Sequence, residues 1–235
     1  MVDLGLGFDF DFGPGDVRFF DRVAPLYDRL MPPADADALA DALSVSRRPV
    51  RTVLDVAGGT GRAARVLSGL VDADADDTGG VAAGGAGDAD PGGETDASET
   101  VERGHGVVVV DRSRGMLRVA RARGHECVAA DATHLPVPDD AVDAVTVVDA
   151  LHHVRDQRAL LAEARRVVAP GGVVVVVDFD PTTLRGRALV ALERAVGFDS
   201  TFSTPDDLAR FLDREGFVGR VVDPGFGYVV VGRVE

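Results

Sequence analysis

The sequence predicts an α/β fold, a Rossmann-like, doubly wound, mostly parallel seven-stranded sheet that ends in an antiparallel β-hairpin. Two observations predict it. Short apolar runs rich in valine alternate along the chain with longer segments in which apolar residues recur at helical spacing. The short runs contain almost no polar residue, which is typical of strands buried on both faces of a parallel sheet.

Each expected element follows from its local pattern. Helical spacing predicts helices over residues 17–31, 35–46, 61–70, 113–123, 157–168 and 205–215. Apolar runs predict strands over residues 50–56, 107–110, 127–130, 144–148, 173–178, 218–222 and 228–234. Only residues 223–227 separate the last two strands, so they must be antiparallel, because a parallel crossover needs about a dozen residues.

The charged residues are strongly biased toward acids. The chain has 235 residues and a formal net charge of −14, with 31 aspartates, 8 glutamates, 25 arginines and no lysine. This halophilic composition is typical of proteins that stay dispersed in concentrated salt. We expect no nucleic-acid partner, because no large basic face is available for phosphates.

One segment differs in composition from the rest. Residues 72–100 hold seven aspartates, seven glycines, seven alanines and two glutamates, and Val81 is their only larger aliphatic side chain. Such a segment buries too little apolar surface to offset its ordering entropy, so we expect a disordered surface insertion over residues 72–104. It interrupts an expected catalytic domain over residues 49–235, which follows an expected helical cap over residues 1–48.

The location of the protein is predicted from its cysteine content and its apolar runs. A single cysteine, Cys127, cannot form an internal disulfide, and the first residues carry no basic region of a secretory signal. The longest apolar runs are far shorter than a membrane span. We therefore expect a cytoplasmic protein without a transmembrane segment.

The stretch VLDVAGGTGR, residues 53–62, predicts a nucleotide-binding turn between a strand and a helix. The loop Ala57-Gly58-Gly59-Thr60-Gly61 permits close backbone approach to a ligand, and it fits both a dinucleotide and S-adenosylmethionine. Asp55 favours the second ligand, because a carboxylate repels a pyrophosphate but attracts the ammonium of the methionine moiety.

Asp111 ends the next strand, where an acid accepts hydrogen bonds from the two hydroxyls of a ribose. Both candidate ligands carry this ribose, so Asp111 does not distinguish them. Arg112 could meet the 2′-phosphate of NADP, although the arginines of residues 112–123 fit a solvated helix face better. We include Arg112 and Met116 among the expected cofactor-binding residues.

Residues 129–145, AADATHLPVPDDAVDAV, resemble the class I S-adenosylmethionine-dependent methyltransferases. VVDALHHVRD at 147–156 and LLAEARRVVAPGGVVVVVDF at 160–179 resemble the motifs that follow in that family, so the resemblance covers residues 19–180. It implies S-adenosylmethionine as cofactor, with Asp131 and Ala132 reading the adenine edge. It also implies a small-molecule methyl acceptor and Asp149 close to the reacting methyl group.

A narrower resemblance connects the chain with the C-methyltransferases of ubiquinone and menaquinone biosynthesis. FFDRVAPLYDRLM at 19–31 and the loop residue Ala57 carry it, and it implies that Tyr27 lines the site and that the acceptor is a quinone or another apolar molecule. The segment DALHHV departs from that group, which has a Gly-Leu-Arg-Asn type of segment there. Generic small-molecule methyltransferases instead have paired histidines at this position.

The expected catalytic residues are His152 and His153, because histidine titrates near neutral pH and accepts a proton when the acceptor must lose one. We expect no metal site, since the five histidines and one cysteine lack clustered ligand spacing. Two alternatives remain open, a non-catalytic protein that binds S-adenosylmethionine and an NAD(P)-dependent oxidoreductase.

Overall fold

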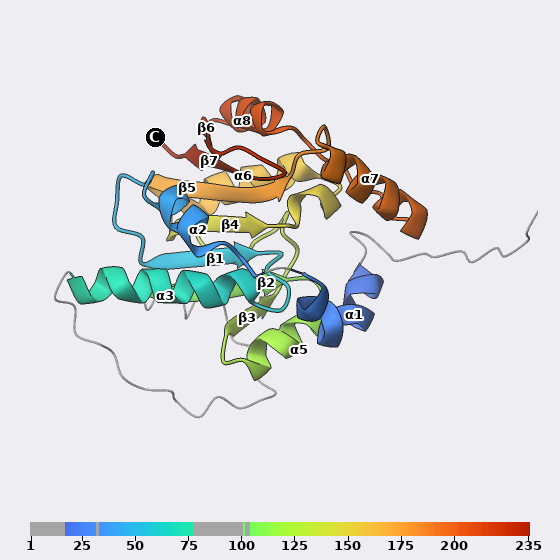
Figure 1. Cartoon of the computed structure of the whole chain (residues 1–235). Coiled ribbons are helices and arrows are strands. Elements are labelled where there is room, and N and C mark those ends of the chain that lie inside the picture. Colours follow the sequence, from blue (N-terminus) through green and yellow to red (C-terminus); the bar gives the residue numbers. More distant parts are fainter. Residues whose placement is uncertain (1–16, 32, 78–100, 102–103) are drawn as a thin grey trace, which may run out of the picture.

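A seven-stranded sheet with helices on both faces forms the body of the molecule in the computed structural model (Figure 1). The structure describes residues 17–31, 33–77, 101 and 104–235. The strands are β1 (Thr52–Val56), β2 (Gly106–Asp111), β3 (Glu126–Ala129), β4 (Val142–Val148), β5 (Val168–Phe179), β6 (Val218–Asp223) and β7 (Gly227–Arg233). The helices are α1 (Val17–Leu30), α2 (Ala36–Leu43), α3 (Arg62–Asp77), α5 (Arg114–Ala122), α6 (Gln157–Val167), α7 (Leu184–Val196) and α8 (Pro205–Arg214), with a 3-10 turn η2 (Leu151–His153).

The strand order is β3-β2-β1-β4-β5-β7-β6, which is that of a doubly wound sheet. The pairs among β1 to β5 are all parallel, whereas β7 pairs antiparallel with both β5 and β6. The predicted fold class and the antiparallel C-terminal hairpin are therefore confirmed. All parallel strands end on the same side of the sheet, and η2, α1 and α7 lie beyond these ends (Figure 1).

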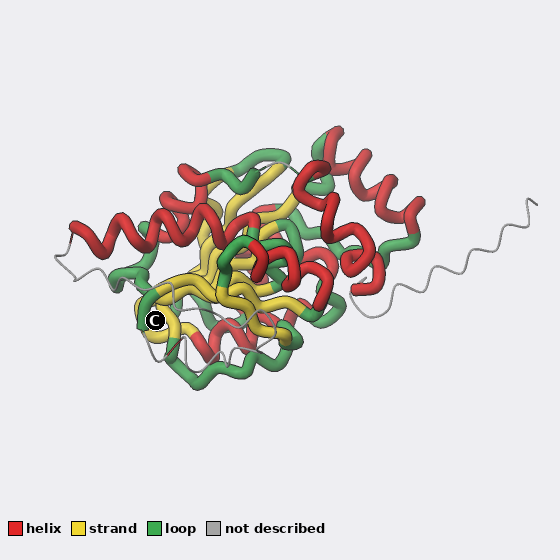
Figure 2. The backbone as a smooth tube through the Cα atoms, turned by 90° about the horizontal axis from the view of Figure 1, so that it is seen from below, coloured by secondary structure: helices red, strands yellow, loops and turns green. Residues whose placement is uncertain are grey.

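Helices lie on both sides of the sheet (Figure 2). Two hydrophobic clusters pack on its opposite faces. Successive residues of a strand point to opposite faces, so Val174 and Val176 of β5 join one cluster and Val173 and Val175 join the other. Helices α6 and α8 cover the first cluster, while α2, α3 and α5 cover the second. Burial on both faces explains why these strands are apolar at every position.

The helix after the glycine loop is longer than predicted. It was expected to end at residue 70, but α3 continues to Asp77 and so enters the segment expected to be a disordered insertion. Val101, at the other end of that segment, is buried in a core cluster. The end of α3 and the buried Val101 both fall within the range expected to be an insertion, and the insertion itself stays a prediction. Residues 78–100 and 102–103 lie outside the described residues.

Two further differences concern the C-terminal half. Strand β5 begins at Val168, before the Pro-Gly-Gly turn at which the predicted strand starts, because Val168 already pairs with Val142. Helix α7 was not predicted at all. Its mixed arginine and alanine sequence shows weak periodicity, whereas its ends are well defined by the Thr183 side chain at the start and by left-handed Gly197 at the end.

The N-terminal helices occupy different places. Leu39, Ala42 and Leu43 of α2 are buried in the core cluster that also contains α3, while α1 packs against α5. The division of the chain near residue 48 into a cap and a catalytic domain therefore stays a prediction. Within the described part of the chain, no helix has the length and apolar character needed to span a membrane.

Candidate functional site

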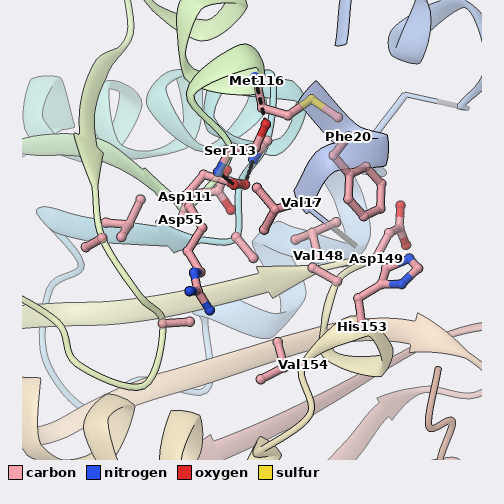
Figure 3. Close-up of a pocket in the computed structure, with 18 of the residues that line it drawn as sticks. Val17, Phe20, Asp55, Asp111, Ser113, Met116, Val148, Asp149, His153 and Val154 are labelled. Carbon is pink, nitrogen blue, oxygen red and sulfur yellow. Dashed lines mark hydrogen bonds between the residues drawn. The ribbon is translucent and has the colours of Figure 1, made fainter. Parts of the chain in front are cut away.

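A cavity of about 280 Å³ lies at the carboxyl ends of the parallel strands. In an open α/β sheet this is the expected place for a ligand, at the point where the strand order reverses. Its walls come from the ends of β1, β2 and β4, from the loop after β3, and from α1. Figure 3 shows Asp111, Ser113 and Met116 toward one end of the cavity and His153 and Val154 toward the other.

The carboxyl group of Asp55 lies beneath the glycine loop. Asp55 is completely buried and accepts a hydrogen bond from Thr146 Oγ1 on β4 at 2.9 Å. A β-carbon on Gly58 would lie 2.5 Å from Asp55 Oδ2, so only glycine fits there. Burial raises the pKa of Asp55 to about 7. Its Oδ2 atom has no hydrogen-bond partner among the described residues, although this group lines the cavity.

Asp111 holds the glycine loop and the start of α5 together. Its carboxylate accepts from Gly59 N–H at 2.9 Å and from Ser113 N–H at 2.7 Å. Burial raises the pKa of Asp111, against the effect of these two bonds. Each carboxylate oxygen can accept more than one hydrogen bond, so the same group can also bind the hydroxyls of a ribose.

The loop after β3 presents a second acid to the cavity. Asp131 Oδ1 accepts from Thr133 N–H at 3.0 Å and Thr133 Oγ1 at 2.8 Å, while its Oδ2 lies 3.3 Å from Arg112. Burial alone would raise the pKa of Asp131, but the Thr133 bonds and Arg112 outweigh it and lower the pKa. Arg112 is about half exposed and lines the cavity. Because it pairs with Asp131, its side chain is not part of a purely solvated helix face.

A buried ion pair between Arg62 and Asp149 lines the cavity. The two side chains are 9% and 8% exposed. Asp149 has a φ of 53°, a left-handed conformation that non-glycine residues adopt infrequently. Burial raises the pKa of Asp149, and the Arg62 guanidinium opposes that shift. The pair joins the start of α3 to the end of β4.

Helix α1 closes the cavity over the glycine loop. Asp21 accepts from Ser113 Oγ at 2.7 Å and Gly115 N–H at 2.8 Å, and Asp28 accepts from Thr60 Oγ1 at 2.5 Å. Tyr27 lines the cavity between these acids, and burial raises its pKa to about 12. The two acids therefore hold Tyr27 against the site.

His152 is buried below the cavity wall between two acids. Its Nδ1 lies 2.7 Å from Asp178 Oδ1, its Nε2 lies 3.6 Å from Glu193 Oε1, and its ring stacks on Phe202 at 4.4 Å. Burial lowers the pKa of His152, but the two carboxylates outweigh it and raise the pKa to about 10. Near neutral pH His152 is therefore an imidazolium that connects β5 with α7.

His153 has a different environment, although it is the next residue. It lines the cavity, and its ring contacts Phe20 at 5.0 Å and Phe198 at 5.2 Å, both edge to face. Ser200 Oγ lies 3.4 Å from His153 Nδ1. Figure 3 shows Phe20 of α1 beside the His153 ring. Of the two histidines, His153 is the one that a bound molecule can reach.

Most of the residues predicted from the sequence meet at this cavity. The cavity-lining ones are Tyr27, Asp55, Ala57, Gly58, Gly59, Thr60, Asp111, Arg112, Met116, Asp131, Ala132, Asp149 and His153. Gly61 does not line it, because its α-carbon faces His125, whose Cδ2 would lie 2.4 Å from an added β-carbon. His152 does not line it either, for the reason given above.

Several residues that line or support the site were not predicted from the sequence. Of these, Arg62 could most readily have been predicted as a site residue, because it is a cationic residue directly after the last glycine of the loop. The others, Asp21, Asp28, Asp178 and Glu193, come from segments distant in sequence. Only the fold shows their contacts.

The ring nitrogens of His152 and His153 and a carboxylate oxygen of Glu193 lie within 4.8 Å of one another. These three groups could hold a metal ion. Asp178 and Glu193 already pair with the His152 imidazolium, however, so a metal ion would have to displace its proton.

Comparison with known proteins agrees with this geometry. Residues 88–176, from before β2 into β5, match the family model described as a methyltransferase domain. A solved structure described as a complex of DhpI with S-adenosylhomocysteine is 26% identical, with a TM-score of 0.60, over 94% of this chain and 96% of that chain.

This chain resembles the class I S-adenosylmethionine-dependent methyltransferases, in its fold and over the matched residues.

Other similarities to known methyltransferases are more distant or shorter. A S-adenosylmethionine-dependent methyltransferase of Thermotoga maritima has the same fold, at a TM-score of 0.62 and 18% identity over 93% of this chain and 99% of that chain. A demethylmenaquinone methyltransferase of Mycobacterium sp. (strain KMS) is 33% identical over 107 residues, 40% of this chain and 46% of that protein. The chain spans less than half the length of the curated relatives it matches.

We predict that Arg62→Ala lowers the free energy of unfolding by about 3 kcal/mol, because it leaves the buried Asp149 carboxylate without its cation. Urea denaturation at pH 7.5 measures the change. Arg62→Met combined with Asp149→Asn removes both charges and should recover part of the loss. The control is Arg210→Ala, which breaks the exposed ion pair with Asp207 and should leave the urea midpoint unchanged. Equal midpoints for Arg62→Ala and Arg210→Ala would contradict a structural role for the buried pair.

Proposed function

We propose that the protein transfers a methyl group from S-adenosylmethionine to a small, largely apolar acceptor. The observation that most supports this proposal is the negative charge of the cavity. Asp55, Asp111 and Asp149 end three neighbouring strands, all are at least half-buried, and burial raises the pKa of each. Arg62 forms an ion pair with Asp149, and the three carboxyl groups outnumber this one cation, so the strand ends favour a cationic ligand. S-adenosylmethionine carries a sulfonium and an ammonium, whereas the pyrophosphate of NAD(P) is anionic.

Each part of the donor has matching groups. The Asp55 Oδ2 atom beneath Gly58, which has no hydrogen-bond partner among the described residues, suits the ammonium of the methionine moiety. The carboxylate of Asp111 suits the ribose hydroxyls. Asp131 and the backbone of Ala132 suit the adenine edge, with Met116 against its ring. We assign Ala57, Gly59, Thr60, Tyr27 and Arg112 to the walls around these groups.

The acceptor end of the cavity is apolar and aromatic. Val17 and Phe20 of α1 face Val148, Val154 and the ring of His153 there. These groups suit a flat, largely apolar molecule. The partial similarity to demethylmenaquinone and ubiquinone methyltransferases makes a quinone precursor the first acceptor to assay.

Bound S-adenosylmethionine supplies a methyl group on a good leaving group, so the protein contributes mainly alignment and a dry site. Helix α1 supplies part of the cavity wall, and the Asp149–Arg62 pair fixes the end of β4. His153 is placed to accept a proton from an acceptor hydroxyl or carbon acid. His152 is a positioning residue, since it anchors η2 to Asp178 and cannot reach the cavity.

Calorimetry with S-adenosylmethionine, S-adenosylhomocysteine and NADP tests the ligand. We expect the first two to bind and NADP not to bind. Asp111→Ala should raise the dissociation constant of S-adenosylmethionine by about 100-fold, because two hydrogen bonds to a charged group are lost. The control is Asp206→Ala on the exposed side of α8, which should leave the dissociation constant of S-adenosylmethionine unchanged.

Tight NADP binding without S-adenosylmethionine binding would overturn the proposal. If the protein transfers no labelled methyl group to any component of a cell extract, the alternative of a non-catalytic protein that binds S-adenosylmethionine is favoured.

We predict that S-adenosylmethionine binds more weakly below pH 7. The folded-state pKa of Asp55 is about 7, and the ammonium selects the ionised carboxylate, so a proton must leave before the ligand binds. The dissociation constant should rise about fivefold from pH 7 to pH 6 and about tenfold from pH 6 to pH 5. Calorimetry across this range measures it, and Asp55→Asn should flatten the profile. A flat wild-type profile would exclude contact between the ammonium and Asp55.

Variants of the two histidines should separate their roles. His153→Ala should lower kcat by about 100-fold with little effect on donor affinity or melting temperature, because it removes a proton acceptor from the cavity wall. His152→Ala should lower the melting temperature, because it leaves Asp178 and Glu193 buried without a cation. The measurement uses an acceptor found in the extract assay. The contrary outcome is that His152→Ala keeps the wild-type melting temperature and changes the pH dependence of kcat. In that case His152 would be the proton acceptor and His153 the positioning residue.

A further inference from the structure

Helix α7 has an outer face whose composition contrasts with the rest of the chain. Leu184, Ala188, Ala191, Leu192 and Ala195 are spaced so that they share one side of the helix, and all are exposed. Leu184 is 86% and Leu192 is 62% exposed, which makes them two of the most exposed large apolar side chains in the described structure. This outer face therefore forms an apolar stripe in contact with solvent.

Arginines border the stripe. Arg185 lies on one side of it, and Arg187 and Arg194 lie on the other, and all three are exposed. The single acid of the helix, Glu193, points the opposite way and is buried against His152. Among the described residues no ion pair joins these three arginines to a carboxylate, in a chain whose formal net charge is −14. The outer face of α7 is thus both apolar and locally cationic.

Helix α1 repeats this arrangement on the same side of the molecule. Arg22, Leu26 and Arg29 are exposed and share one side of the helix, with Leu26 54% exposed. Its acids Asp21 and Asp28 instead bind α5 and the glycine loop. Both helices lie beyond the carboxyl ends of the strands, where the cavity is, as Figure 1 shows.

Aromatic contacts join the two helices. Phe19 of α1 contacts Phe198, which follows the end of α7, at 4.8 Å, and Phe20 contacts the same ring at 6.1 Å. His153 also contacts Phe198, so the acceptor end of the cavity adjoins this junction. We call the outer surfaces of α1 and α7, with Arg22, Leu26, Arg29, Leu184, Arg185, Arg187, Leu192 and Arg194, the arginine–leucine face.

We propose that the arginine–leucine face docks the protein on a bilayer that contains anionic lipids, with the cavity side toward the membrane. Leucines between arginines on a helix surface are the features with which helices lie in a lipid headgroup layer. The proposal rests on the proposed function, because an apolar acceptor is held in the bilayer and must pass from there into the cavity.

Charge favours this partner and this orientation. Each arginine near an anionic surface adds attraction, which acts over about a Debye length of 8 to 10 Å. The rest of the chain has a net negative formal charge, so an anionic surface repels it on average. The exposed leucines distinguish the face from a site for nucleic acid, which would need polar and cationic groups without an apolar stripe.

Vesicle co-sedimentation of the full chain at 0.15 M salt tests the proposal. The vesicles are pure phosphatidylcholine, or phosphatidylcholine with a third of phosphatidylglycerol. We expect at least about tenfold tighter binding to the anionic vesicles. Leu184→Asp with Leu192→Asp should weaken that binding by about tenfold or more, and so should Arg185→Gln with Arg187→Gln. None of these four residues lines the cavity, so S-adenosylmethionine affinity and the melting temperature should stay as in the wild type.

Two control variants match these changes. Val218→Asp alters an exposed apolar residue on β6, and Arg51→Gln with Arg65→Gln removes two exposed arginines elsewhere on the chain. Both should bind anionic vesicles like the wild type. Equal binding of all variants, or no preference for anionic vesicles, would overturn the proposal. A dimer in sedimentation velocity that Leu184→Asp with Leu192→Asp dissociates would also overturn it, because the face would then join two copies.

The two proposals fail in different ways. Binding of S-adenosylmethionine without any vesicle binding would overturn only the membrane docking. Vesicle binding that needs the arginine–leucine face, without S-adenosylmethionine binding, would overturn the proposed function.

Discussion

The buried carboxyl group of Asp55 is the constraint on which the site depends. It lies at the end of a fully buried strand, and its hydrogen bond from Thr146 ties β1 to β4. Its position beneath Gly58 requires a residue without a β-carbon and so shapes the loop above it. A carboxylate in such a place is costly unless a cation comes near it. The same arrangement therefore shapes the glycine loop and favours a positively charged ligand.

Charge pairing also connects the interior with the outer helices. The His152 imidazolium lies between Asp178 of β5 and Glu193 of α7, so one buried cation holds α7 near the sheet. This use of Glu193 leaves only arginines as the exposed charged residues of α7. In α1, Asp21 and Asp28 are used in the same way against α5 and the glycine loop. The inward acids hold both helices, and the outward arginines determine the charge of the surface around the cavity.

The paired histidines show where sequence reasoning reached its limit. His152 and His153 are adjacent and chemically identical, and the sequence predicted both as catalytic candidates. The 3-10 turn of η2 directs one ring to Asp178 below the cavity and the other into the cavity wall. Asp178 and Glu193 are 26 and 41 residues away from His152 along the chain, so no local pattern could reveal them. Likewise, α7 has weak periodicity because it packs through few residues and exposes the rest.

The sequence by itself determined the fold class, the antiparallel end of the sheet and most of the residues around the cavity. These follow from local rules, because valine runs form buried strands and strand-end acids with a glycine loop converge wherever parallel strands end together. Only the tertiary structure decided that Gly61 packs on His125, that Arg62 pairs with Asp149, and that His153 alone of the two histidines faces the cavity. Those outcomes depend on which distant side chains share a buried space, and burial is a property of the folded chain.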